Sequence, residues 1–329
     1  MFSKQRSVKD VIIDSRSHVV VYLNIDNIRW YFNKEKDFRL ELWPECDPYV
    51  RAKMIMEMVV KYAAFGVIFV LHEVMLPILE YIRAECESHE IQCRVIPYHT
   101  DPSAMLFVYC IPKEITILGS TQHLLVKGEC PLSDGKYGAY PDVDGRKKPE
   151  WRKWALGEYP RSMGEVCVKF PDGRIISVYA WHPALYDDIR IEQTAMMAKI
   201  LQSNQQPWIA GGDLNCMRFN DDPEDVGKLN TAQIGLLRAV GQWETPEITS
   251  TFYSCPWDIR HKLSAEKKKI YDELLRTKSP KFREFCESVD RSGGALDQVF
   301  TSKLRADVEA IQCVESDHAV MICKLRGLI

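Results

Sequence analysis

A short apolar run that ends on an acid and an amide is the feature that most constrains the fold of this chain. Residues 207–215 read PWIAGGDLN, which predicts a buried β-strand whose backbone can turn at Gly211 and Gly212. Side chains two residues apart in an extended segment point to the same side, so we expect Asp213 and Asn215 to face one site. There Asp213 would bind a cation or hold a nucleophilic water while Asn215 donates to an anionic oxygen. The alternative is a glycine turn in which both residues make only local hydrogen bonds.

Five other β-like runs also carry a polar residue at one margin. They are residues 19–23 before Asn24 and Asp26, 66–71 before His72 and Glu73, 175–181 before His182, 295–300 with Asp297, and 319–323 after Asp317 and His318. In a domain built on sheets, such strand ends can converge on one rim. A single acid at a strand end is usually a turn residue, but the whole set has the acids, amides and imidazoles of a metal-assisted hydrolase.

These six segments, in this order, resemble the motifs of the endonuclease/exonuclease/phosphatase superfamily, which includes deoxyribonuclease I. The resemblance extends from residue 19 to residue 325, nearly the whole chain. It implies an α+β fold in which two packed, mainly antiparallel β-sheets are flanked by helices, a four-layer αββα sandwich. Asn24, Asp26 and the segment after Glu73 look most similar to the branch of tyrosyl-DNA phosphodiesterase 2 and the abasic endonucleases.

The resemblance also implies a role for each motif residue. The implied metal ligands are Asn24, Asp26, Glu73 and Asp317, with Glu73 as the principal one. The implied catalytic residues are Asp213, Asn215, His182, His318 and Asp297. Asp213 and Asn215 would orient or activate the attacking water, Asp297 would hold the ring of His318, and His182 would support charge on the phosphate or leaving group. Oxygen ligands favour Mg²⁺ or Mn²⁺ over zinc, and which histidine is the acid stays open.

The sequence departs from the superfamily pattern at positions beside the motifs. Leu23 stands where an aromatic residue is common, and His72 stands where glutamine is common. Ala319 and Val320 follow His318, where the inositol polyphosphate 5-phosphatases would have proline. We therefore expect the metal geometry or the substrate to differ from those of typical members.

The motifs predict one catalytic domain over residues 18–329 after a polar lead-in at residues 1–17, with insertions near residues 120–160 and 257–294. Both insertions carry basic residues, among them Arg146-Lys147-Lys148 near two tryptophans and Lys267-Lys268-Lys269. Such residues can hold phosphates and stack bases in a nucleic-acid groove. Alternatively, the first insertion is a solvated loop anchored by its tryptophans and the second is a solvated helical pair.

The composition favours a soluble intracellular protein of the cytoplasm or nucleus. Its eleven cysteines are odd in number and scattered without a CxxC pair, which suits reduced thiols better than a disulfide framework. No uncharged run approaches the roughly twenty residues of a transmembrane segment, and residues 1–14 show no signal or transit pattern. The net charge of −3 argues against a broadly basic surface, although a local groove can still be basic.

Together, these patterns predict a hydrolase: a divalent-metal-dependent phosphodiesterase acting on nucleic acid, either as an endonuclease or exonuclease or as an enzyme that processes DNA ends. One alternative is a phosphoesterase for phosphoinositides or sphingolipids, although no strong amphipathic membrane anchor is evident. Another is a non-catalytic module that binds a phosphorylated small molecule or protein.

Overall fold

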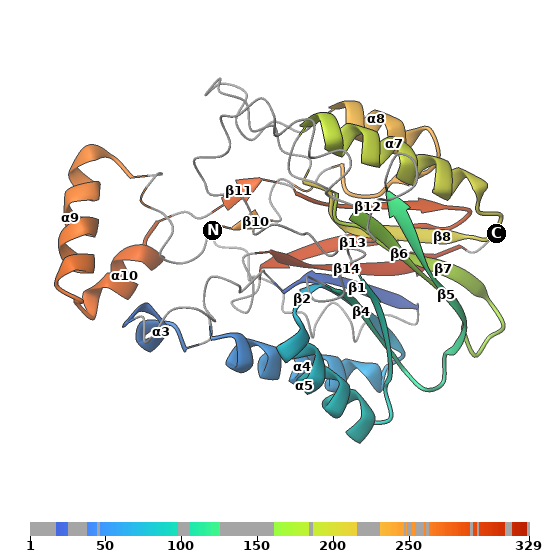
Figure 1. Cartoon of the computed structure of the whole chain (residues 1–329), viewed down its shortest axis with the longest axis horizontal. Coiled ribbons are helices and arrows are strands. Elements are labelled where there is room, and N and C mark those ends of the chain that lie inside the picture. The colour runs from blue at the N-terminus through green and yellow to red at the C-terminus, as the bar shows by residue number, and fades with distance from the viewer. Residues whose placement is uncertain are drawn as a thin grey trace, which may run out of the picture.

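The computed structural model shows two β-sheets lying face to face, with helices on both outer faces (Figure 1). It describes residues 18–25, 38–44, 47–97, 106–125, 161–183, 187–215, 231–246, 248, 252–253, 260, 263–289, 292–294, 296–312 and 318–327. The layers run helix, sheet, sheet, helix, which confirms the predicted αββα sandwich. The predicted lead-in at residues 1–17 and residues 126–160 of the first insertion lie outside the described residues.

The first sheet combines strands from both ends of the chain. Its strands are β1 (Val19–Asn24), β2 (Val67–Val74), β3 (Gln92–Pro97), β4 (Leu106–Ile111), β13 (Arg305–Gln312) and β14 (Ala319–Arg326). They lie in the order β13-β14-β1-β2-β4-β3. The central strands β1 and β2 are parallel, and all other neighbours are antiparallel.

The second sheet repeats this arrangement with a contiguous part of the chain. Its strands are β5 (Thr116–Leu125), β6 (Arg161–Lys169), β7 (Ile175–Ala180), β8 (Trp208–Asp213), β9 (Gln242–Trp243) and β12 (Asp297–Ser302). They lie in the order β5-β6-β7-β8-β12-β9, with β7 and β8 parallel and the other pairs antiparallel. Each sheet therefore holds one central parallel pair within an antiparallel frame.

Two pairs of helices cover the outer faces. α4 (Pro48–Ala63) and α5 (Leu76–Ser88) pack on the first sheet, and α7 (Asp187–Ser203) and α8 (Thr231–Arg238) pack on the second. Asp47 caps α4 by accepting hydrogen bonds from the backbone N–H groups of Tyr49 and Val50. None of the helices in the described ranges is long and apolar enough to cross a bilayer.

A smaller helical unit lies beyond the edge of the sheets, at the left in Figure 1. It contains α3 (Phe38–Leu42), α9 (Ala265–Arg276) and α10 (Lys281–Glu287), beside a short ribbon of β10 (Phe252–Tyr253) and β11 (Ser292–Gly294). Trp43, Leu263, Tyr271, Phe282 and Cys286 form its separate apolar core. The helical pair expected in the second insertion is therefore present, and it packs on the segment after α3.

The buried strands explain why the apolar runs in the sequence are continuous. In β2, Phe69 and Leu71 pack against the helices, while Ile68 and Val70 face the other sheet. A strand buried on both faces needs apolar residues at every position. All six β-like runs identified in the sequence are strands in the structure.

The edge strand β5 differs from its prediction. The sequence places residues 120–125 in the first insertion, but they belong to β5 and pair with β6. Most of this segment is exposed and polar, because an edge strand needs little burial on its outer face. The apolar alternation that reveals a strand in a sequence is therefore missing there.

Candidate active site

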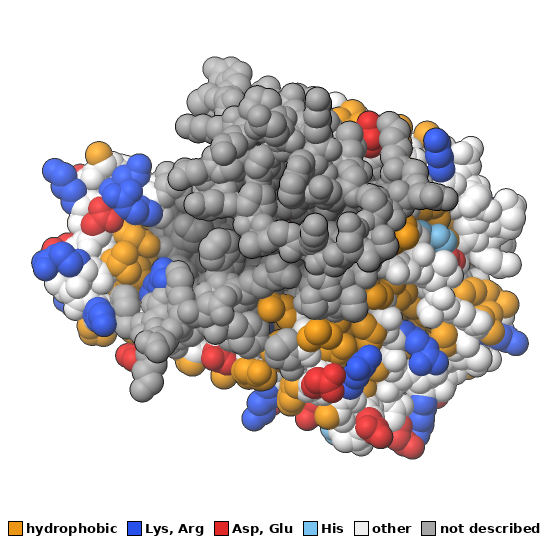
Figure 2. Space-filling view, in the orientation of Figure 1, with side chains coloured by type: hydrophobic (Ala, Val, Ile, Leu, Met, Phe, Trp, Pro, Cys, Tyr) orange, Lys and Arg blue, Asp and Glu red, His pale blue; other side chains and the backbone are white. Residues whose placement is uncertain are grey.

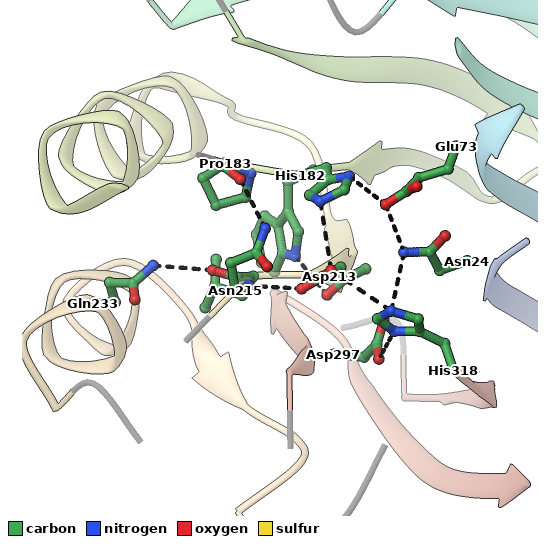
Figure 3. A network of polar contacts seen from close by, with 12 residues as sticks. Asn24, Glu73, His182, Pro183, Asp213, Asn215, Gln233, Asp297 and His318 are labelled. Atoms are coloured by element: carbon green, nitrogen blue, oxygen red, sulfur yellow. Dashed lines mark hydrogen bonds and ion pairs between the residues drawn. The ribbon is translucent and has the colours of Figure 1, made fainter. Parts of the chain in front are cut away.

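Polar side chains from both sheets meet at one edge of the sandwich, at the seam between the sheets (Figure 3). The described members are Asn24, Glu73, His182, Asp213, Asn215, Asp297 and His318, each 9% exposed or less. They lie at or beside the ends of β1, β2, β7, β8, β12 and β14. The prediction that these strand ends converge is confirmed for all seven, whereas Asp26 and Asp317 lie outside the described residues.

Glu73, His182 and Asp213 form a compact group of possible metal ligands. One ligand atom from each lies within 4.8 Å of the others. His182 lies between the acids, with Nδ1 3.4 Å from Glu73 Oε1 and Nε2 3.5 Å from Asp213 Oδ2. These separations are longer than the ~2.7–2.9 Å of a strong charge-assisted hydrogen bond. The two ring nitrogens face different acids, so only one of them can bind an ion held by this group.

The chemistry of this group fits a divalent cation. Two buried carboxylates at close range repel each other unless a positive charge lies between them. His182 adds an imidazole to the two acids of this group, whereas the ligands expected from the sequence, Asn24, Asp26, Glu73 and Asp317, all offer oxygen. A mixed set of imidazole and carboxylate accepts Mn²⁺ or Zn²⁺ as well as Mg²⁺.

Asn24 connects the ligand group to His318. Its amide Nδ2 donates a hydrogen bond to Glu73 Oε1 at 3.2 Å and lies 3.4 Å from His318 Nε2. Asn24 can therefore orient Glu73, while its contact with His318 Nε2 is long for a hydrogen bond and can give way to a water there.

His318 is held by Asp297 in one orientation. Its Nδ1 lies 2.7 Å from Asp297 Oδ2. Since an ionised carboxylate only accepts hydrogen bonds, the proton belongs on Nδ1, and Nε2 of the neutral ring is then an acceptor. Nε2 points into the site, 3.8 Å from Asp213 Oδ2. The contact expected between Asp297 and His318 is present, in a geometry that suits a proton acceptor.

Asp213 lies in an environment that disfavours its charge. Burial raises its pKa to about 6, against the opposing effects of His318, the Asn215 N–H and Arg161, while Asp297 also raises it. Asp297 is the direct cross-strand partner of Asp213, so the two carboxyls are neighbours on adjacent strands. A carboxyl with a pKa near neutrality can exchange a proton under physiological conditions.

The chain turns sharply at two of the site residues. Glu73 has φ 57 and Asn215 has φ 48, a left-handed conformation that costs non-glycine residues roughly 1–3 kcal/mol. The expectation that Asp213 and Asn215 share one extended segment is therefore wrong, because Asn215 has left the strand. Its N–H turns back to Asp213 Oδ1 at 2.7 Å, and its Nδ2 donates to the Pro183 carbonyl at 2.9 Å. Asn215 thus fastens the end of β8 to the segment after β7.

Two residues outside the sequence motifs also contribute to the site. Arg161, at the start of β6, is 5% exposed, and its charge favours the ionised form of Asp213. Gln233 of α8 is fully buried, and its Nε2 donates to the Leu214 carbonyl at 3.1 Å (Figure 3). A lone arginine at a strand start and a glutamine on a helix have many ordinary uses, so no sequence signal distinguishes them.

His72, which replaces the common glutamine, lies below the ligand group in the space between the sheets. It is completely buried, and burial lowers its pKa to about 3 although Asp297 acts in the opposite direction. The ring is therefore neutral at physiological pH.

Comparison with known proteins identifies this arrangement of strands. No protein-family model matches the chain, and no curated protein matches its sequence. An endonuclease/exonuclease/phosphatase from Bacteroides vulgatus matches with a TM-score of 0.56 and 13% identity, over 95% of this chain and 100% of that one. The chain has the endonuclease/exonuclease/phosphatase fold.

Two further matches extend the comparison to proteins with named activities or ligands. A mannosyl-6-phosphatase from Bacteroides thetaiotaomicron matches with a TM-score of 0.53 and 14% identity, over 94% of this chain and 100% of that one. TDP2 of D. rerio, complexed with a single-strand DNA product, matches with a TM-score of 0.54 and 12% identity, over 95% of this chain and 100% of that one. The shared feature is the fold, so the chemistry of this chain has to be argued from its own residues.

Proposed function

We propose that this protein is a divalent-metal-dependent phosphodiesterase that hydrolyses a phosphoester bond in nucleic acid. The observation that carries the proposal is the group of Glu73, His182 and Asp213 within 4.8 Å of one another, beside the paired His318 and Asp297. A cation site and an oriented imidazole on one buried rim are what hydrolysis of an anionic ester requires. A phosphatase and a protein bound to a DNA product share the fold, which supports phosphoester chemistry.

The residues divide into those that hold the cation and those that handle the proton. Glu73 and Asp213 would hold a divalent ion together with His182, with Asn24 fixing Glu73 and with Asp26 and Asp317 as further ligands. The bound ion would withdraw charge from the phosphate oxygens and from the leaving oxygen.

The attacking water would lie within hydrogen-bond distance of both Asp213 Oδ2 and His318 Nε2, which are 3.8 Å apart. His318 accepts its proton at Nε2, because Asp297 keeps the other ring proton at Nδ1. As the new bond to phosphorus forms, the bond to the leaving oxygen breaks. As a ligand, His182 would support the charge on the phosphate or leaving group through the bound ion, and Asn215 holds Asp213 in position.

The charge on α9 supports a nucleic-acid substrate. Three arginines of this helical unit form ion pairs with neighbouring acids. By contrast, no ion pair within the described ranges involves Lys267, Lys268 or Lys269. Figure 2 shows basic side chains projecting from this unit. Unpaired lysines can contact phosphates of an extended strand, which a small phosphorylated molecule would not reach.

A phosphatase acting on a phosphorylated small molecule is the second candidate, because a mannosyl-6-phosphatase shares the fold. The catalytic rim would be the same, and only the groups that bind the rest of the substrate would differ. A phosphoesterase for phosphoinositides or sphingolipids would use the same rim.

Hydrolysis of a substrate panel in the presence of Mg²⁺, Mn²⁺ or Zn²⁺ tests the proposal. The panel holds single- and double-stranded DNA, RNA, a 5′-tyrosyl oligonucleotide, mannose 6-phosphate, an inositol polyphosphate and sphingomyelin. Asp213→Ala is the inactive variant, and Asp307→Ala, the same change on β13, is the matched control. Turnover of a nucleic acid that needs metal and is lost only in Asp213→Ala supports the proposal. Turnover of a small phosphoester alone favours the second candidate, and binding without any turnover favours a non-catalytic module.

A further inference from the structure

We propose that His72 and Gly212 form a contact that sets the spacing of the two sheets beneath the candidate metal centre, and that His72 is therefore a positioning residue. The inference rests on the proposed metal site and goes beyond its ligands. His72 belongs to β2 of the first sheet, and Gly212 belongs to β8 of the second. Each directly precedes a member of the ligand group, Glu73 in one sheet and Asp213 in the other.

The contact is close enough to require glycine. A Cβ atom on Gly212 would lie 2.1 Å from His72 Cε1 and 2.7 Å from Nδ1. The neighbouring Gly211 is in the same situation, since its Cβ would lie 2.7 Å from the ring of Tyr22. Two rings of the first sheet therefore press on two successive glycines of the second. The glycine pair serves close approach between the sheets as well as the turn that the sequence predicted.

The surroundings of His72 show that its ring acts as a spacer. It is 0% exposed and meets Tyr22 and Phe107 edge-on, with ring centroids 6.0 Å and 5.2 Å away. Within the described part of the chain, neither ring nitrogen has a partner at hydrogen-bond geometry, and the Trp181 backbone has only a minor effect on its pKa. A buried polar group without a partner is unfavourable for folding. The ring therefore acts by its volume, which fills the space between the backbones of β2 and β8.

The geometry of β2 explains why Glu73 needs such support. Leu71 and Val74 both pack on the helix side of the first sheet, and the pairing with β4 shifts register between them. This irregularity redirects Glu73 from the face that strict alternation would give it. Glu73 also takes the left-handed conformation, which persists only where neighbours fix it. His72 on one side and Val74 on the other, both fully buried, provide that fixation.

The ligand group straddles the seam between the sheets, so the width of the seam determines its dimensions. Glu73 comes from the first sheet, and His182 and Asp213 come from the second. Metal sites need their ligands within about 0.5 Å of the correct positions. A change in the His72–Gly212 contact would therefore alter the distance between Glu73 and Asp213 without touching either ligand.

Manganese binding to the full-length protein tests this role separately from catalysis. Four variants are compared with the wild type. His72→Ala removes the spacer, His72→Met keeps its volume without ring nitrogens, His72→Gln keeps hydrogen-bonding groups, and Val70→Ala opens a cavity elsewhere on the same inter-sheet face of β2. Titration with Mn²⁺ followed by electron paramagnetic resonance gives the Kd, and urea unfolding gives the stability of each variant.

We expect His72→Ala to weaken Mn²⁺ binding about tenfold, as the loss of a supporting residue behind a ligand does. His72→Met should bind Mn²⁺ with a Kd within about twofold of the wild type. Val70→Ala should be less stable than the wild type, but its Kd for Mn²⁺ should also stay within about twofold. Equal Kd values for His72→Ala and Val70→Ala would overturn the proposal. Loss of affinity in His72→Met that His72→Gln restores would also overturn it, since hydrogen bonding would then matter instead of spacing. A folded wild type that binds no divalent ion would instead refute the proposed metal-dependent function.

Discussion

Asp213 is the residue at which folding and the proposed function are most clearly opposed. Its pKa in the folded protein is about 6, whereas an unperturbed aspartate titrates near 3.9. The folded state therefore binds this proton more tightly than the unfolded state does. The resulting stabilisation is fully present below about pH 4 and is lost as the pH rises through 6. At neutral pH the protein keeps a buried charge that makes it less stable.

Replacing Asp213 by a neutral residue should show how much stability its buried charge costs. We expect Asp213→Asn without divalent ions to be more stable than the wild type above pH 6, by roughly 2–3 kcal/mol, and about equally stable below pH 4. Urea unfolding between pH 4 and pH 8 measures the difference. Asp307→Asn, at a half-buried position where Asp307 pairs with Arg326, should show no comparable pH dependence. A difference that stays constant with pH would show that the charge of Asp213 is not its source.

Asp297 should act on the reaction through the tautomer of His318. Asn at position 297 can donate a hydrogen bond to Nδ1, which would move the ring proton to Nε2 and remove the proton acceptor. We therefore expect Asp297→Asn to lower kcat by about 100-fold or more with little change in KM. Nitrogen NMR of the histidine ring would report the tautomer directly. An unchanged kcat would remove His318 from the role of proton acceptor.

At the scale of elements, the helical unit of α9 and α10 has its own apolar core, and it carries a cluster of lysines. Its apolar core shares no member with the core between the sheets. Its three consecutive lysines lie in the first half of α9, where positive charge opposes the helix dipole. Such an arrangement contributes little to folding, which is consistent with a role in binding an anion.

Neutralising these lysines tests the nucleic-acid part of the proposal. We expect a Lys267→Ala, Lys268→Ala, Lys269→Ala triple variant to bind single-stranded DNA more weakly and to reduce the slope of log K against log salt by about 2. The control carries the same charge change on other surfaces, at Lys113, Lys169 and Lys199. If both triple variants lose the same affinity, α9 is a solvated face and contributes no specific contact.

The elements also show how far the sequence predicts this structure. Strands buried on both faces are continuous apolar runs, so β1, β2, β7, β8, β12 and β14 could be recognised together with the polar residues at their ends. The edge strand β5 could not, because it is largely exposed. The register shift at Glu73 and the left-handed Asn215 were equally hidden, since both depend on contacts between distant segments. The sequence therefore predicts which residues meet at the site, whereas their contacts with one another are seen only in the structure.

At the scale of the whole molecule, the proposed metal site joins the two sheets. Because Glu73 lies on one sheet and Asp213 on the other, an ion bound between them should stabilise the complete sandwich. We expect Mn²⁺ at 100 times its Kd to raise the free energy of unfolding by about 2.7 kcal/mol. Thermal unfolding measured across a Mn²⁺ titration checks this, and a chelator should reverse the effect. A similar rise in Asp213→Ala would place the ion elsewhere.

The path of the chain through the two sheets bears on synthesis. The second sheet uses only residues 116–302, whereas the first needs β1 to β4 and also β13 and β14, with β14 pairing beside β1. During translation the second sheet can be completed while the first still has an open edge. His318, just before β14, is the last of the described site residues to leave the ribosome. A nascent chain therefore carries Glu73, His182 and Asp213 before it carries His318, and we expect the proposed activity only once its first sheet closes.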